Sequence, residues 1–371
     1  MKLTRSGIFS LTLSFGLIWC QVCASQENLG TKYQRCSIIQ MMIEHPMYLF
    51  NEEVAHAFCN IPVSDRFYNH GLGVKVAKFA TQEYEDQEHS ITSFIEQTNL
   101  ATRTVAKWFN WDKNTGKFNM ELVKERGLYN ANQLERQLAN FSIRGSSILS
   151  DAGENLINNT YLIMSDICYK GNYSNKEEFA KSKNEHRSFD VKITSYIFQL
   201  DWDYELLNKF YINYYAGYPH FTKNIHDYTF SYIGKVESDY AKESDQFSQS
   251  ELIELVVARC LDMNLAKVAK THPDFRIKAL LTNTDPIQAD IGLKEGVKAG
   301  DMYEVLEKKE DENGICSYER VGIVTPKKEM IWDNRYMADK EGTAEAKYGY
   351  TTFEVVKGKK IKRGMLIREI E

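Results

Sequence analysis

The chain has 371 residues and a formal net charge of −5, with 43% hydrophobic and 26% charged residues. This length is sufficient for two or three hydrophobic cores of ordinary domain size. The acidic balance argues against the basic field that nucleic-acid-binding proteins carry, so we expect no nucleic-acid partner.

Residues 1–24 have the pattern of a secretory signal peptide. Two basic residues precede the apolar run GIFSLTLSFGLIW, and small residues precede a predicted cleavage after Ala24. An uncleaved anchor is the alternative, although the run is short for a spanning helix. Bulky residues before Cys20 and Cys23 disfavour a lipid-anchored start there. We therefore expect export to the periplasm or cell surface, and the sequence leaves peripheral membrane association and homo-oligomerisation open.

Five cysteines remain after this cleavage, an odd and widely spaced set that does not resemble a disulfide framework. They are Cys36, Cys59, Cys168, Cys260 and Cys316. One bridge, Cys36 to Cys59, stays open from the sequence. We interpret the set as structural thiols.

Residues 25–275 are predicted to form a helix-rich α+β domain with a few core strands. Apolar residues recur at helical spacing in 72–80 and again in 91–109, which predicts two amphipathic helices. The stretch NMELVKERG predicts a third, with Asn119 as N-cap and Gly127 as its end.

Two β-type runs follow these helices. TYLIMSDI is predicted to be a buried strand from its length and its Thr, Tyr and Ile content. FDVKITSYIFQLDW is predicted to be a second, with alternate residues on one face. Those residues are Val191, Ile193, Ser195 and Ile197.

Eleven aromatic residues crowd the segment 202–232. They could form a stacking platform for sugar or peptide, but packing of a helix against the sheet is the interpretation that we favour. Asp201 and Asp203 could likewise be a glycosidase-type carboxylate pair, whereas Asp strongly favours helix N-caps. This segment motivates the alternative function, a secreted hydrolase acting on glycan or peptide.

SQSELIELVVARCLDMNLAKVAK is the clearest helix. Ser248 and Glu251 have the spacing of a capping box, and Pro273 ends the helix. Its apolar face comprises Ile253, Val256, Val257, Cys260 and Leu261.

Residues 276–371 contain short strands separated by turns, including a hairpin signal at Asn313-Gly314. The sequence predicts a small β-barrel or SH3-like module here. The overall prediction is therefore an α+β protein in two parts.

The glycine-rich stretch GLKEGVKAGDMYEV has neither the spacing of a phosphate-binding loop nor a helix after it. Its pattern recurs in IKRGMLIREI, so Gly300 and Gly364 are predicted to be turn residues with positive φ. Lys294 and Lys298 are then expected to be solvated.

Ligand-like patterns elsewhere are incomplete. Asp112 to Gly116 begins like a calcium loop, but later ligand positions fail, and a turn explains the same residues. His220 and His226 lack tight metal spacing. We expect no catalytic, cofactor or metal site.

The frame IGLKEGVKAGDMYEVLEKKEDENG…YERVGIVTP with VVKGKKIKRGMLIREI resembles the C-terminal β-module of flagellar assembly protein T. Tyr303 stands where that pattern favours Phe. The preceding region resembles exported bacterial envelope proteins of uncharacterised function and is distantly similar to the curli-secretion lipoprotein family in its order of helices and strands. The resemblance implies a non-enzymatic envelope component, an assembly or interaction protein that binds other envelope proteins.

Overall fold

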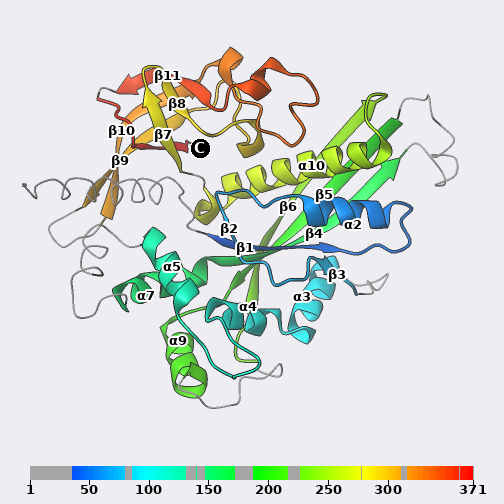
Figure 1. The fold of residues 1–371 in the computed structure, drawn as a ribbon, viewed down its shortest axis with the longest axis vertical. Coiled ribbons are helices and arrows are strands. Elements are labelled where there is room, and N and C mark those ends of the chain that lie inside the picture. The colour runs from blue at the N-terminus through cyan, green and yellow to red at the C-terminus, as the bar shows by residue number, and fades with distance from the viewer. Residues whose placement is uncertain are drawn as a thin grey trace, which may run out of the picture.

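The computed structural model describes residues 36–79, 86–130, 139, 147–171, 187–215, 226–276, 278–310, 316–358 and 360–370. Over these residues the chain is an α+β protein with seven α-helices, an open sheet and a closed barrel. Figure 1 shows the barrel at one end, with helix α10 between it and the sheet. The predictions on the leader, His220 and the Asn313-Gly314 turn lie outside the described residues.

The open sheet has the strand order β2-β1-β4-β5-β6, with β3 also paired to β1. Strand β1 is parallel to β2, β3 and β4, whereas β4, β5 and β6 form an antiparallel meander. The bounds are β1 Ser37–Ile43, β2 Tyr68–Asn69, β3 Val76–Ala77, β4 Thr160–Gly171, β5 Arg187–Leu200 and β6 Phe230–Ser244. Both predicted core strands are therefore confirmed, as β4 and β5.

Helices cover both faces of this sheet (Figure 1). One face carries α2 and α10 over a core that includes Val191 and Ile193, so the predicted buried face of β5 is confirmed. The other face carries a larger core, to which α3, α4, α5 and α9 contribute, and α7 packs against α5. The bounds are α2 Asn51–Asn60, α3 Gln87–Gln97, α4 Leu100–Trp108, α5 Glu121–Asn130, α7 Ser147–Glu154, α9 Tyr204–Phe210 and α10 Gln249–Thr271.

Three details of the predicted helices are wrong. Residues 72–79 form no helix, because the Met42 N–H bonds to the Lys75 carbonyl at 2.8 Å and Val76–Ala77 pairs with β1 as the short strand β3. The segment 91–109 is two helices, α3 and α4, since Asn99 adopts a left-handed conformation with φ 50° between them. Gly127 does not end its helix, which continues to Asn130.

The C-terminal region is a closed six-stranded barrel with the order β10-β11-β8-β7-β12-β9. This confirms the small C-terminal barrel predicted from the sequence. Its bounds are β7 Ala279–Thr284, β8 Ile287–Ala289, β9 Tyr303–Glu310, β10 Cys316–Pro326, β11 Thr351–Gly358 and β12 Leu366–Glu369. The predicted hairpin is present as the antiparallel pair β9–β10.

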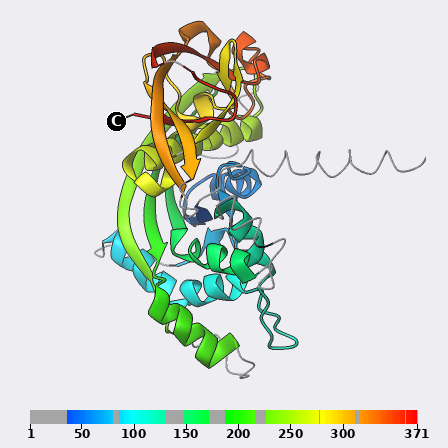
Figure 2. The same ribbon diagram turned by 90° about the vertical axis from the view of Figure 1, so that its left-hand side faces the viewer.

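Helix α10 serves both parts of the molecule. Its Ser248–Glu251 capping box is confirmed, and its predicted apolar face is buried against the sheet. The opposite side also carries buried residues, among them Arg259 and Asp262. In Figure 2 the barrel sits directly above this helix at one end of the molecule. Helix α10 therefore lies between the sheet and the barrel, with buried residues on both of its sides.

A long connection between β10 and β11 also crosses from the barrel to α10. Met337, in this connection, is 9% exposed and belongs to the core formed by α2, α10 and the sheet. The two parts are thus joined by packing as well as by the chain itself.

Candidate binding site at the junction

Within the part of the chain that the structure describes, four ion pairs span the junction between α10 and the C-terminal region. Their nitrogen–oxygen distances are 2.7 Å for Arg259–Glu341, 2.8 Å for Lys340–Glu251, 2.7 Å for Lys270–Glu369 and 3.9 Å for Lys294–Asp262. They are spread along the helix from its first turn to its last, so the junction runs along the length of α10.

Arg259 is the most deeply buried of these charges, at 1% exposed. Its Nε and Nη2 donate to the Tyr336 carbonyl at 3.1 and 2.8 Å, and Nη2 also donates to Glu341. Burial alone would raise the pKa of Glu341, but Lys242 and Arg259 hold that pKa below its usual value. A buried guanidinium with these partners fixes the β10–β11 connection onto the helix.

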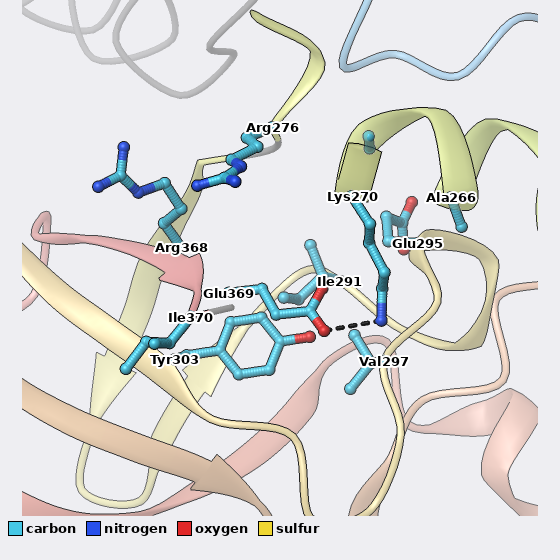
Figure 3. Close-up of a pocket in the computed structure, with 11 residues that line it drawn as sticks. Ala266, Lys270, Arg276, Ile291, Glu295, Val297, Tyr303, Arg368, Glu369 and Ile370 are labelled. Atoms are coloured by element: carbon cyan, nitrogen blue, oxygen red, sulfur yellow. Dashed lines mark hydrogen bonds and ion pairs between the residues drawn. The ribbon is translucent and has the colours of Figure 1, made fainter. Parts of the chain in front are cut away.

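A cavity of about 140 Å³ opens where the last turns of α10 face the barrel. Figure 3 shows Ala266 and Lys270 of the helix on one side and Tyr303 and Ile370 opposite. The apolar lining is Ala266, Ala269, Ile291, Val297 and Ile370, and the polar lining is Lys270, Arg276, Glu295, Tyr303, Arg368 and Glu369. Both parts of the molecule are therefore required to form the cavity.

Tyr303, from β9, contributes a phenol to this cavity. Its ring packs edge-on against Phe353 in the barrel core, with centroids 5.4 Å apart. Burial raises the pKa of Tyr303, and the nearby Glu369 adds to the effect. In this lining Lys270 and Glu369 bond to each other, as the dashed line in Figure 3 marks. With its pKa raised, the Tyr303 phenol is neutral and can donate a hydrogen bond.

The barrel side of the cavity is built by the glycine-rich stretch. A Cβ on Gly292 would lie 2.2 Å from the Trp332 carbonyl oxygen, so only glycine fits. Glu295 accepts from the Gly292 N–H at 2.8 Å and from Asn334 Nδ2 at 2.6 Å. This turn, the 3₁₀ segment η4 Leu293–Glu295, holds its backbone by internal bonds.

The predicted turn glycines are confirmed, with φ of 91° at Gly300 and 90° at Gly364. Lys298 is exposed, as expected. Lys294 is not a solvated residue, since its side chain is 23% exposed and faces Asp262 across the junction. The sequence gives no signal for this contact, because its two residues lie in different parts of the fold.

Asp201 and Asp203 have separate structural partners. Asp203 is the N-cap of α9, where its carboxylate accepts from the Leu206 N–H at 2.8 Å. Asp201 accepts from the hydroxyls of Thr229 and Ser231 at 2.6 and 2.9 Å. The N-cap interpretation is therefore confirmed.

The described part of the aromatic segment 202–232 is mainly core. Trp202, Phe210, Tyr228 and Phe230 are all buried, and Phe210 stacks on Phe109 with centroids 4.0 Å apart. Tyr204, at 77% exposed, is an exception. The core interpretation is confirmed for these residues.

Asp112 to Gly116 form a turn rather than an open ligand loop. The Asp112 carboxylate accepts from the Asn114 N–H and the Thr115 hydroxyl, both at 2.8 Å, and Gly116 has φ 65°. These bonds lower the pKa of Asp112. Across the described ranges, no group of three or more His, Cys, Asp or Glu side chains is placed to hold a metal ion.

Four of the cysteines are free thiols, so the bridge from Cys36 to Cys59 does not form. Cys36 donates instead to the Asp274 carbonyl at 2.5 Å. The Cys168 Sγ lies 3.8 Å from Asp166 Oδ1. The same oxygen lies 2.6 Å from His45 Nε2. Burial and the Asp166 charge raise the pKa of Cys168, which disfavours a reactive thiolate.

No protein-family model matches this chain, and no curated protein matches it either. Within the described ranges, no helix combines the length and apolar character needed to cross a bilayer.

Proposed function

We propose that this chain is an exported, envelope-associated assembly or interaction protein, which acts by binding other envelope proteins rather than by catalysis. On this proposal its barrel is an SH3-like module equivalent to that of flagellar assembly protein T. The observation that supports binding is the cavity between α10 and the barrel, which joins small apolar residues to the buried Tyr303 phenol (Figure 3).

The size of the cavity favours a protein side chain as its occupant. Pockets for drug-sized ligands usually measure ~300–1,000 Å³, whereas this cavity measures about 140 Å³. Pockets that hold one apolar anchor residue are typical of the centre of protein interfaces. Ala269, Val297 and Ile291 would contact an aliphatic side chain, and Tyr303 could donate to a carbonyl beside it.

The test is affinity capture from envelope extract, with residues 25–371 as bait and Ala269→Leu as the cavity-filling variant. Ala241→Leu, on the exposed side of β6, adds the same atoms away from the cavity. We expect one or more envelope proteins to be retained by the parent and by Ala241→Leu, and lost with Ala269→Leu. Equal retention by all three baits would contradict a role for the cavity.

The hydrolase alternative gains no specific support from Asp201 and Asp203, because each is held by its own local partners. The same capture also addresses it. Retention of soluble glycans alone, with no envelope protein, would favour the hydrolase and reject the interaction proposal.

A further inference from the structure

Asp262 places a carboxyl group inside the junction. The residue is 7% exposed, and its nearest ion-pair partner, Lys294 Nζ, lies 3.9 Å from Oδ1. That separation is beyond direct hydrogen-bond distance. Ser64 and Phe67 close the space around it, leaving a cavity of about 10 Å³. An ionised Asp262 would therefore be a poorly compensated buried charge.

Most of the charged groups that face Asp262 form ion pairs or hydrogen bonds with other residues. On its own helix, Arg259 binds Tyr336 and Glu341. From the β10–β11 connection, Arg335 is paired with Asp333 at 2.7 Å.

From η4, Lys294 attracts an ionised Asp262, whereas Glu295 repels it. Arg66, in the segment that follows α2, is directed to Glu295 and Asp290. Burial raises the pKa of Asp262 to about 7, with Lys294 opposing that rise and Glu295 adding to it.

We propose that the junction is a pH-sensitive device, in which a protonated Asp262 favours docking of the barrel on α10 and an ionised Asp262 loosens it. The cavity would then change with the pH outside the cell. This inference rests on the proposed function only where it links the pH outside the cell to binding at the cavity. Docking of the barrel on α10 itself requires no partner.

The direction follows from proton linkage. In the docked state the pKa of Asp262 is about 7, and in a solvated, undocked state it would return to ~4. The docked state therefore binds the proton more tightly, so docking is strongest at acid pH and weakens as the pH rises toward 7. Between pH 5 and 8 the docking equilibrium should fall roughly 10- to 100-fold.

Amide hydrogen exchange of the full mature chain, without any partner, tests this directly. The readout is protection of residues 290–297 at pH 5 to 8, corrected for the chemical exchange rate, with α4 as the internal reference. We expect protection to fall on the order of tenfold or more in the parent, and to be independent of pH in Asp262→Asn. Asp190→Asn, an exposed site on β5, should behave as the parent.

The same pH profile in the parent and in Asp262→Asn would overturn the proposal. Should Asp262→Asn fail to fold, the carboxyl carbon of Asp262 in the parent can be titrated by NMR. A midpoint near 7 supports the device and one below 5 rejects it. Because no partner is present, none of these outcomes depends on the capture experiment.

Discussion

The backbone of Gly364 shows how one residue constrains the barrel. Its φ is 90°, and a Cβ there would meet no atom within 4 Å, so any cost of substitution comes from the backbone alone. We expect Gly364→Val to destabilise the protein by ~1–3 kcal/mol, and Gly300→Val to behave alike. Urea denaturation of both variants measures this cost.

Lys298→Gln is the matched control, because Lys298 is exposed in the same turn as Gly300. We expect it to change the free energy of unfolding by less than ~0.5 kcal/mol. A melting temperature that nucleotide raises in the parent, but not in Lys298→Gln, would show that the stretch binds phosphate after all.

A close contact between two helices explains why Gly127 lies inside α5 and not at its end, where the sequence pattern places it. A Cβ on Gly127 of α5 would lie 1.8 Å from the Leu149 carbonyl oxygen of α7. We expect Gly127→Ala to cost about 1–3 kcal/mol by overpacking, although alanine favours helices intrinsically. Glu125→Ala, exposed on the same helix, should change stability by less than ~0.5 kcal/mol. Equal stability of the two variants in thermal melts would refute the close packing.

The local features of elements were predictable from sequence, and those that depend on distant partners were not. The cap at Asp203, the capping box of α10 and the strands β4 and β5 follow from nearby residues. The segment 72–79 instead depends on the pairing of Val76–Ala77 with β1, which overrides its apolar spacing. Helix spacing likewise cannot show whether Gly127 ends a helix or admits a neighbour.

At the scale of the whole molecule, the sequence predicts two parts but not how they join. Lys270 and Glu369 meet across 99 positions, and Arg259 and Glu341 across 82. No local pattern encodes such pairs, so the candidate cavity could not be located from sequence. Tyr303 was the one lining residue that the family resemblance singled out, because Phe is favoured at that position. The division at residues 275 and 276 stays a prediction.

The contacts at the junction determine whether barrel and sheet unfold together. Because α10 packs against the sheet and also carries the buried Arg259 contact to the β10–β11 connection, we expect the full chain to melt in one cooperative transition. Arg259→Ala removes three hydrogen bonds from a buried site and should cost ~3 kcal/mol. It should also separate the barrel transition from that of the sheet, as calorimetry would resolve. Lys340→Ala breaks a half-exposed pair with Glu251 and should change little. If Arg259→Ala still melts in one transition at the parent's temperature, the buried contact is not what holds barrel and sheet together.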